Sequence, residues 1–372
     1  MSNTRGLEGV VATTSSVSSI IDDVLTYQGY HIDDLANYSS FEEVIYLLWN
    51  GKLPNKTELE TFSNDLVANM SVPDEIFNDM KAYSIADVNP MAALRTAVSQ
   101  LGLYDREADE VEEDAGKRIA LRLQAKIASI VTGFARIRGG KDPIQPKEDL
   151  GFAANFLYML NGEEPKDIAV DALNKALVLH ADHELNASTF TARVCVATLS
   201  DFYSGITAAI GALKGPLHGG ANERVMAMLN DIGELDQVDD YVQALFDNKE
   251  KIMGFGHRVY KDGDPRAKHL RDMSRQLTSI TGETKWYDMS VAVEEKVTRD
   301  KGLLPNVDFY SASVYHSLGI DHDLFTPIFA VSRIAGWNAH IMEQYADNRL
   351  IRPRAEYVGP DTQKYIPLDE RS

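Results

Sequence analysis

Apolar residues recur every three or four positions along most of the chain, which is the spacing that predicts amphipathic helices. The clearest run covers residues 116–137 and stops at the Gly139-Gly140 pair, which is typical of a helix end. Two other helices are expected to begin with the Ser/Thr-x-x-Glu pattern of a capping box, one at Ser40 and one at Thr57. Together these patterns predict a mostly helical protein.

Further helices are expected over residues 165–179, 187–199, 222–229, 241–248, 265–281, 291–299, 311–318 and 324–345. The best strand pattern lies near the N-terminus, where residues 9–20 and 25–32 suit a small hairpin region. Two joints that contain glycine or proline, at residues 211–220 and 317–323, enclose roughly residues 220–319. The sequence therefore predicts a smaller domain inserted into a larger helical one.

The charge balance is strongly acidic, with a formal net charge of -19. This argues against nucleic acid or an anionic membrane as a partner. No apolar run is long enough to span a bilayer, and the first twenty residues lack a signal-peptide pattern. The single cysteine, Cys195, rules out an intrachain disulfide and fits a reducing compartment. We therefore expect a cytoplasmic protein.

The segment 251–271 departs from this acidity, because it holds six basic residues and two acidic ones. Its GFG sequence is not a dinucleotide fingerprint, since Val259 stands where the third glycine would be. The segment is either a solvated basic turn or a place where backbone and cations meet an anionic small molecule, with His257 at its edge.

His218 lies in the glycine-rich stretch GPLHGGANE, directly before an expected helix. Glycines let a backbone approach a ligand closely, and the positive end of a helix dipole favours a neutral histidine ring. A neutral imidazole N–H can polarise a carbonyl group without giving up a full proton. We interpret His218 as a functional residue, with a histidine that only caps a turn as the alternative.

His180, His183 and Glu184 fall on one face if the stretch HADHELNAS is helical. The order H-x-x-H-E differs from the H-E-x-x-H zinc pattern, and no cysteine or carboxylate cluster nearby completes four ligands. The stretch therefore predicts no metal site. His183 is either a buried, hydrogen-bonded histidine or a residue that contacts substrate.

Asp308 stands between Val307 and Phe309. A carboxylate in apolar surroundings has a raised pKa and is a stronger base. An ordinary N-cap aspartate of a helix is the alternative, and the sequence alone leaves both open.

Two arginines lie where a cation is unfavourable unless an anion binds it. Arg266 falls in the first turn of an expected helix, where the helix dipole opposes a positive charge. Arg333 shares a helical face with Phe329 and Trp337, and an unpaired charge buried there would be strongly destabilising. Arg333 therefore needs a carboxylate partner, from the protein or from a ligand.

Arginine binds both oxygens of a carboxylate at once, so these residues imply a substrate with more than one carboxylate. Histidines and one aspartate, without a metal or dinucleotide pattern, suit proton abstraction next to a carbonyl. Five segments, in this order, resemble the signature of the citrate synthase family: HADHELNAS, GPLHGGANE, GFGHRVYKDGDPRA, PNVDFYSASVY and SRIAGWNAHIMEQ followed by RPRAEYVG. The resemblance spans essentially the whole chain.

The resemblance implies three catalytic residues. Asp308 would remove a methyl proton from acetyl-CoA, and His218 would stabilise the resulting enol or enolate through the thioester oxygen. His257 would polarise and protonate the carbonyl of oxaloacetate. Citryl-CoA would then be hydrolysed to citrate and CoA.

The same resemblance implies the binding residues. Oxaloacetate would be held by His183, Arg266, Arg333 and Arg352. CoA would be bound by Met253, Gly254, Phe255, Gly256 and Lys261, while Arg258, Lys268 and Arg271 would add long-range attraction. Arg352 would come from the other subunit of a homodimer, with Arg354 as the alternative for this role.

The implied fold is all-α, with a small N-terminal β element, in the compact dimeric form found in Gram-positive bacteria and archaea. A large domain would comprise residues 1–219 and 320–372, and a small domain residues 220–319. No metal, no cofactor beyond the co-substrate acetyl-CoA, and no nucleic-acid or membrane partner are expected. A 2-methylcitrate synthase acting on propionyl-CoA is the alternative, because one methylene is worth only about 1–3 kcal/mol of discrimination. A non-catalytic helical scaffold would have little reason to keep the three catalytic residues together.

Overall fold

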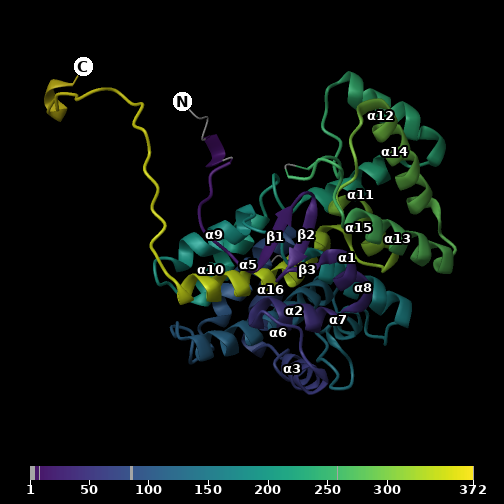
Figure 1. The fold of residues 1–372 in the computed structure, drawn as a ribbon, viewed down its shortest axis with the longest axis horizontal. Coiled ribbons are helices and arrows are strands. Elements are labelled where there is room, and N and C mark those ends of the chain that lie inside the picture. Colours follow the sequence, from purple (N-terminus) through teal and green to yellow (C-terminus); the bar gives the residue numbers. More distant parts are fainter. Residues whose placement is uncertain (1–4, 8, 84–86, 258, 372) are drawn as a thin grey trace.

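The computed structural model describes residues 5–7, 9–83, 87–257 and 259–371. Within these residues the chain folds into α-helices and one small sheet, so the predicted all-α class with a small N-terminal β element is confirmed (Figure 1). The helices are α1 (Ile32–Tyr38), α2 (Phe41–Asn50), α3 (Lys56–Ala68), α4 (Asp74–Ala82), α5 (Pro90–Leu101), α6 (Glu113–Arg138), α7 (Phe152–Asn161), α8 (Asp167–His180), α9 (Ala187–Val196), α10 (Phe202–Leu213), α11 (Ala221–Ile232), α12 (Val238–Asp247), α13 (Ala267–Thr281), α14 (Lys285–Lys301), α15 (Val307–Ser317) and α16 (Phe325–Ala346).

The sheet is antiparallel and lies where the sequence predicted a hairpin. Its strands are, in order, β1 (Ser18–Ile21), β2 (Val24–Tyr27) and β3 (Tyr30–His31). Ser18 pairs with Tyr27, and the register leaves only Asp22 and Asp23 in the turn between β1 and β2. Both turn residues have positive φ, 50° and 62°, as a two-residue type I′ hairpin turn requires.

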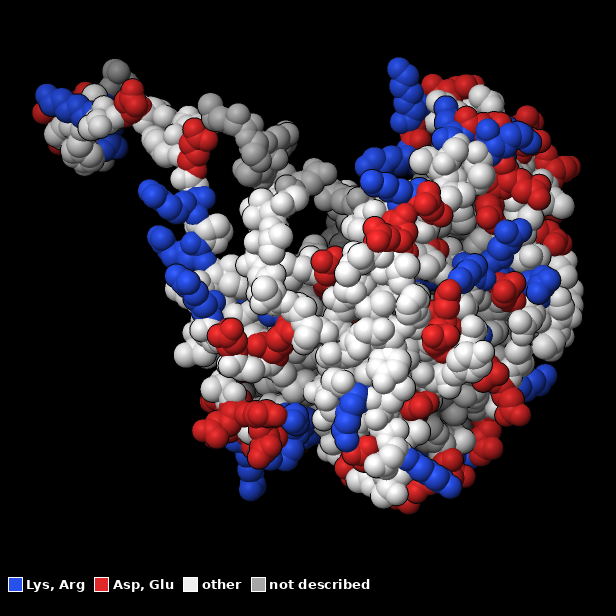
Figure 2. All heavy atoms as spheres, in the orientation of Figure 1, with Lys and Arg blue, Asp and Glu red and all other residues white. Residues whose placement is uncertain are grey.

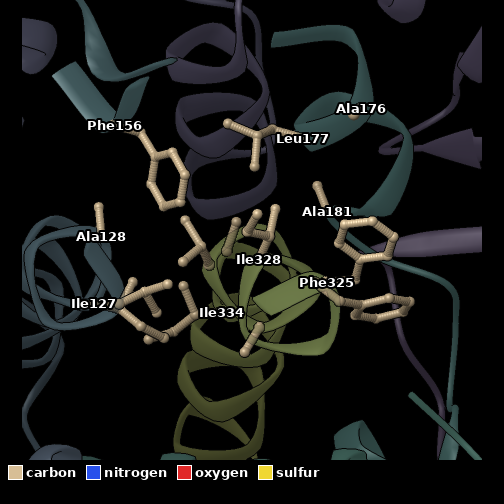
Figure 3. Packing of buried hydrophobic residues seen from close by; sticks show 14 of the residues in the cluster. Ile127, Ala128, Phe156, Ala176, Leu177, Ala181, Phe325, Ile328 and Ile334 are labelled. Carbon is tan, nitrogen blue, oxygen red and sulfur yellow. The ribbon is translucent and has the colours of Figure 1, made fainter. Parts of the chain in front are cut away.

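Helix α16 is buried along most of its length and runs through the helical body. Figure 3 shows Ile328 and Ile334 of this helix among Ile127 of α6, Phe156 of α7 and Leu177 of α8. Each fully buried aliphatic or aromatic side chain of this kind stabilises the fold by about 1.5–3 kcal/mol relative to exposure. This packing fixes the helix that carries Arg333.

Local capping explains where two of the predicted helices begin. Ser40 Oγ accepts a hydrogen bond from the Glu43 N–H, and the Glu43 carboxylate accepts one from the Ser40 N–H, which confirms the predicted capping box of α2. In α3 the box is formed by Asn55 and Glu58, so the box predicted from Thr57 is wrong by two positions. Asparagine is as good an N-cap as serine, but the Ser/Thr-x-x-Glu pattern does not include it.

Most predicted helices overlap observed ones, with shifted ends. The 116–137 helix is α6, and α8 begins at Asp167 rather than at Pro165. Helices α1, α4, α5, α7 and α10 were not predicted. Helix α10 was missed because its composition is so apolar that no polar face marks the helical period.

Two corrections affect the site. Helix α13 begins at Ala267, so Arg266 is its cap residue and not part of its first turn, as had been predicted. Helix α15 begins at Val307, four positions before the predicted start, which places Asp308 in its first turn.

Helices α11 to α15 form a group beside the other helices, which Figure 1 shows at the upper right. They contact the remaining helices mainly through α8 and α16. The chain enters and leaves this group near residues 214–220 and 318–321. The division into residues 1–219 with 320–372 and residues 220–319 stays a prediction.

The C-terminal segment, residues 347–371, leaves the end of α16 and runs away from the helical body (Figure 1). Residues 352–371 are exposed throughout, including the apolar side chains of Tyr357, Val358 and Tyr365. In an isolated chain these apolar side chains stay in contact with water. The segment is therefore suited to pack against the surface of another molecule.

Acidic and basic side chains are interspersed over the visible face of the body, and further basic side chains line the first part of the C-terminal segment, at the left of Figure 2. The arginines of this part are Arg349, Arg352 and Arg354. In the part of the chain that the structure describes, no helix combines the length and the apolar character needed to cross a membrane.

Candidate active site

Two loops bring His183 and His257 together. Their ring centroids are 5.1 Å apart, and the Tyr260 ring lies 5.5 Å from that of His183 and 4.5 Å from that of His257. The Tyr260 hydroxyl is 3.0 Å from His183 Nε2. Helix α8 ends at His180, so the predicted helical face shared by His180, His183 and Glu184 is wrong. His183 instead lies in the irregular loop that follows the helix.

The backbone around His257 fixes which ring nitrogen carries the proton. His257 Nδ1 accepts hydrogen bonds from the N–H groups of Val259, at 3.0 Å, and Tyr260, at 3.3 Å. A nitrogen that accepts from an amide has no proton of its own, so the neutral ring carries its proton on Nε2. Burial and the nearby Arg266 lower the pKa of His257, which favours this neutral form. The Nε2–H is therefore the donor that the ring offers to a ligand.

The loop that carries His257 is tied to the start of α15. The Gly256 N–H donates to the carbonyl of Leu304, at 2.9 Å, and the Asn306 N–H donates to the carbonyl of Gly254, at 2.8 Å. The Asn306 side chain donates to the Gly256 carbonyl at 3.0 Å. These bonds connect the segment before His257 with the segment directly before Asp308.

Gly254 is required by packing and by backbone conformation. Its φ is +81°, and a Cβ at this position would lie 2.8 Å from atoms of Phe309 and Val225. Glycine alone tolerates both conditions. This explains the first glycine of the GFG sequence without a ligand, and the contact predicted between Gly254 and CoA stays a prediction.

His218 contacts the N-terminus of α9. Its Nε2 accepts a hydrogen bond from the Ser188 N–H at 3.3 Å and lies 2.8 Å from Ser188 Oγ. Because Ser188 is the second residue of α9, the ring caps one of the N–H groups that a helix start leaves without a partner. The predicted effect of a helix dipole thus comes from α9 rather than from α11, which begins at Ala221.

The contact with Ser188 also fixes the protonation of His218. An amide N–H can only donate, so Nε2 is the acceptor and the neutral ring carries its proton on Nδ1. Burial, with a contribution from Arg333, lowers the pKa of His218 to about 4. His218 is therefore a neutral hydrogen-bond donor at pH 7.

Asp308 is the second residue of α15, and Asn306 is the cap, accepting a hydrogen bond from the Asp308 N–H at 3.0 Å. This excludes the alternative in which Asp308 is itself the N-cap. Its Oδ1 is buried and has no hydrogen-bond partner among the described residues. Burial raises the pKa of Asp308 to about 7, although the positive charges of Arg266 and Arg333 oppose the rise. A carboxylate with a pKa near neutrality is well matched to proton abstraction.

Arg266 is buried and forms a bidentate ion pair with Asp264. Its Nε and Nη2 donate to the two carboxylate oxygens at 2.9 and 2.8 Å. Asp264 also accepts a hydrogen bond from the Val307 N–H at 3.0 Å, which holds the pair against the start of α15. Burial opposes the charge of Arg266, but Asp264 outweighs this and raises the pKa of Arg266. Asp264 occupies the edge formed by Nε and Nη2, so a ligand carboxylate would bind on the Nη1 side.

Arg333 is buried, with 2% of its surface exposed, near the middle of α16. Its Nε donates to the His180 carbonyl at 2.8 Å, and its guanidinium lies 4.7 Å from the centroid of the Phe329 ring. Among the residues that the structure describes, it forms no ion pair. Burial lowers the pKa of Arg333 to about 10, so it keeps its charge at neutral pH. Of the two partners left open by the sequence, a protein carboxylate and a ligand carboxylate, the geometry favours the ligand.

The predicted face of Phe329, Arg333 and Trp337 is confirmed, because all three residues contact the site. The Phe329 ring is 6.3 Å from that of His218. The Trp337 Nε1–H donates to Ser188 Oγ at 3.1 Å, and Ser188 in turn binds His218. Helix α16 therefore supports the histidine as well as the arginine.

Sequence reasoning missed the roles of Asp264, Ser188 and Tyr260. The Asp-x-Arg spacing before a helix was a usable signal for the ion pair between Asp264 and Arg266. Nothing local indicated the contact from Ser188 to His218, because it joins separate elements. For His180 the structure supports a buried structural histidine, since its Nδ1 lies 2.7 Å from the Ala176 carbonyl and burial lowers its pKa to about 3.

The other predicted binding residues differ in their exposure to solvent. Arg352 and Arg354 are exposed on the C-terminal segment. The Lys261 side chain is exposed, while Met253, Phe255 and Gly256 are half-buried. Arg258 lies outside the described residues.

Two of the other cations in the basic segment have acidic partners. Lys268 pairs with Asp33 at 2.6 Å, and Arg271 lies 3.4 Å from Glu294. Their predicted long-range attraction for anions is reduced accordingly. Among the residues described, no group of three or more His, Cys, Asp or Glu side chains is placed to hold a metal ion, and independence from metal stays a prediction.

The chain is similar to known proteins over most or all of its length. Residues 6–354 match the family model "Citrate synthase, C-terminal domain". The chain is 68% identical to citrate synthase 2 of Bacillus subtilis, with each chain covered in full. It is 51% identical to citrate synthase of Haloferax volcanii, over 99% of this chain and 98% of the relative. The chain called 2-methylcitrate synthase in Mycobacterium tuberculosis is more distant, at 42% identity over 98% of this chain and 92% of that one.

Solved structures agree with these relatives. The ternary complex of citrate synthase from Thermoplasma acidophilum with carboxymethyl coenzyme A and oxaloacetate superimposes with a TM-score of 0.93 at 35% identity, covering 99% of both chains. The two-loop histidine site and the buried arginines therefore lie in a helical fold shared with enzymes that transfer acyl groups.

The chain belongs to the citrate synthase family. It is an acyltransferase of the citrate (Si)-synthase type, an enzyme of the tricarboxylic acid cycle. The alternative of a non-catalytic helical scaffold is therefore rejected.

Replacing Asp308 by asparagine should stabilise the fold at alkaline pH. Burial raises the pKa of Asp308 to about 7, so ionising it opposes folding. This penalty is fully present above pH 7 and falls away as the pH drops toward the ordinary value of 3.8. We expect the melting temperature of Asp308→Asn to exceed that of the wild type at pH 8, with a smaller difference at pH 5. The control is Asp149→Asn, because Asp149 is exposed. Equal shifts of melting temperature in the two variants would show that ionised Asp308 does not destabilise the fold.

Proposed function

We propose that the enzyme condenses oxaloacetate with acetyl-CoA and hydrolyses the resulting citryl-CoA to citrate and CoA. The observation that carries this proposal is Asp308, a buried carboxylate with a pKa of about 7, in one site with two neutral histidine donors and two buried guanidinium groups. A base, donors for developing negative charge and receptors for carboxylates are the groups that such a condensation requires.

Oxaloacetate is proposed to bind between the arginines and the paired histidines. Arg333 is buried, charged and without a carboxylate partner among the described residues, so it would take one carboxylate of the substrate. Arg266 would contribute its Nη1 side, which the pair with Asp264 leaves available. His183 would hold the bound molecule, and the Nε2–H of His257 would point at its keto oxygen.

The first chemical step is proposed to form the enol or enolate of acetyl-CoA. Asp308 would accept a proton from the methyl group, which leaves the electron pair of the broken C–H bond in the enolate. His218 would donate its Nδ1–H to the thioester oxygen, where the negative charge develops. A hydrogen bond to a developing oxyanion in a buried site lowers the barrier far more than the same bond in water.

In the second step the enolate carbon would attack the keto carbon of oxaloacetate. The electron pair of the keto group moves to its oxygen, which His257 polarises and protonates. Attack of water on the thioester of citryl-CoA would then release citrate and the CoA thiol. The attacking water would supply the new carboxyl oxygen and the proton of the CoA thiol. The proton that Asp308 took from the methyl group would return through water to Nε2 of His257, which restores both residues.

Acetyl-CoA is proposed to reach Asp308 along the segment that precedes His257. Met253, Gly254, Phe255 and Gly256 would offer backbone contacts, and the exposed Lys261 would offer a cation to the phosphates. This assignment is supported by the hydrogen bonds that join the segment to the start of α15, the helix of Asp308.

The enzyme is proposed to act as a homodimer in which Arg352 completes the oxaloacetate site of the other subunit. Arg352 is exposed on a segment that leaves the helical body (Figure 1). An arginine placed in this way can serve a neighbouring chain, and C2 symmetry would repeat the contact at both sites. Arg354, two residues further, is the alternative donor. We also propose that this dimer is cytoplasmic.

Thiol release should require oxaloacetate and should be faster with acetyl-CoA than with propionyl-CoA. The measurement is CoA thiol formation with each acyl-CoA, with and without oxaloacetate, and in the presence of EDTA. Activity is expected to persist in EDTA. In the Asp308→Asn variant the general base is lost, so turnover should fall by at least about 100-fold. A preference for propionyl-CoA would instead identify a 2-methylcitrate synthase, and loss of activity in EDTA, restored by a divalent ion, would contradict the proposed mechanism.

Arg333→Leu should fold normally and lose oxaloacetate. Leucine removes a buried charge that has no ion pair, whereas the substrate loses a bidentate partner, so binding should weaken by about 2–5 kcal/mol. The matched variant Arg266→Leu should behave differently, because it leaves Asp264 buried and unpaired and should destabilise the fold by about 3–5 kcal/mol. Thermal unfolding and calorimetric titration with oxaloacetate separate the two. Normal oxaloacetate binding by a destabilised Arg333→Leu would make Arg333 a structural residue.

Mixed dimers should recover activity from two inactive parents. Arg352→Ala and His218→Ala should each be nearly inactive; in a mixed dimer one site has both defects and the other has neither. Random pairing makes about half of the dimers mixed, so about a quarter of all sites should work. Thiol release is measured after co-refolding. Mixed dimers without activity above the parents would show that Arg352 acts within its own subunit or that Arg354 has the role.

A further inference from the structure

The base of the N-terminal hairpin binds the loop that carries His183. Ser18 Oγ accepts a hydrogen bond from the Glu184 N–H at 2.8 Å and donates to the Asp182 carboxylate. The hydroxyl of Tyr27, which pairs with Ser18 in the sheet, lies 3.1 Å from the Asp182 carbonyl and accepts from the Asp182 N–H at 3.3 Å. Both neighbours of His183 in the chain are therefore held by the first two strands.

The tip of the same hairpin binds the loop that carries His257. The Asp23 carboxylate accepts hydrogen bonds from the Lys261 N–H, at 3.1 Å to each oxygen, and from the Asp262 N–H, at 3.0 Å. Lys261 and Asp262 lie four and five positions after His257. Hydrogen bonds to an ionised carboxylate are among the stronger ones in proteins, so this contact restrains the loop.

We propose that this hairpin sets the distance between His183 and His257, and that Asp23 is the residue that positions the His257 loop. The inference rests on the roles proposed above for the two histidines. The hairpin forms hydrogen bonds with both loops. The ring centroids of the two histidines lie 5.1 Å apart, close enough for both rings to face one ligand. Asp23 holds the loop through the backbone of Lys261 and Asp262, and its negative charge also opposes the lowering of the His257 pKa.

The identity of Asp23 agrees with this role. Its φ of 62° favours glycine, asparagine or aspartate, and any of these would satisfy the turn. Of the three, only aspartate offers a charged carboxylate to the two amides. Asp22 has the same type of conformation, with φ of 50°, and its side chain is exposed.

A second contact from the N-terminal region supports the arrangement. Asp33 of α1, which directly follows β3, pairs with Lys268 and with His269 of α13, each at 2.6 Å. These residues lie just after Arg266 in the chain. The hairpin therefore holds the chain within the segment from His257 to Arg266, and α1 holds it just after that segment.

The test compares three variants of the hairpin turn. Asp23→Gly keeps the backbone conformation and removes the acceptor, so the KM for oxaloacetate should rise about tenfold or more, with a smaller change in kcat. Asp23→Asn keeps one neutral acceptor and should recover most of the loss. Asp22→Gly removes a carboxylate from the same turn and should leave the KM within about twofold of the wild type, since no hydrogen bond of the described residues depends on it. Melting temperatures of all three should stay close to that of the wild type.

A wild-type KM in Asp23→Gly, or an equal rise in Asp22→Gly, would overturn the inference. His257→Gln separates this failure from that of the proposed function. If His257→Gln turns over oxaloacetate normally, the role proposed for His257 is wrong, and the inference falls with it. If His257→Gln is impaired while Asp23→Gly is normal, only the role of Asp23 is wrong.

Discussion

Two guanidinium groups buried within one helical protein are the constraint on which the site depends. Burial of a charge is unfavourable unless a partner of opposite charge and hydrogen bonds compensate for it. Arg266 has such a partner in Asp264. Arg333 has the His180 carbonyl and the face of Phe329, but among the described residues no carboxylate lies within ion-pair distance of it. The packing of α16 holds Arg333 in this unfavourable state, and a dianionic substrate would relieve it.

The same burial sets the protonation of the other groups. It lowers the pKa values of His183, His218 and His257. Arg333 lowers that of His218 further, Arg266 lowers that of His257, and both arginines lower that of His183, so the three rings are neutral. It raises the pKa of Asp308, because the carboxylate loses solvent while its Oδ1 gains no hydrogen bond within the described chain. A base and a set of neutral donors thus arise from one physical cause, and separate tuning of each group is not required.

The sequence allowed much of the site to be predicted because its chemistry lies at helix ends and in short loops. Asp308 between apolar neighbours and Arg333 with aromatic residues one turn away were visible as local patterns, and both environments are as expected. Contacts between distant segments were not predictable. Ser188 meets His218 across 30 positions, and Asp23 meets Lys261 across 238, so no local spacing encodes either bond.

The fold shows the same limit. Amphipathic helices such as α6 could be predicted, whereas α10 was missed because its apolar composition hides the period. The boundary of α13 was misplaced because a proline directly after Asp264 suggested an earlier start. Pro265 and Arg266 instead form a turn, in which the Asp264 carboxylate accepts the Arg266 N–H, and the helix begins at Ala267. The prediction of helices therefore failed where a local turn or a largely apolar composition hides the helix pattern.

The most direct test of this account is a crystal structure of the enzyme with oxaloacetate and without an acyl-CoA. The account predicts one carboxylate of the ligand within hydrogen-bond distance of the Arg333 guanidinium, and the keto oxygen facing His257 Nε2. It also predicts that the pair of Arg266 and Asp264 stays intact. Oxaloacetate bound away from Arg333, or Arg333 paired with a protein carboxylate in that complex, would contradict it.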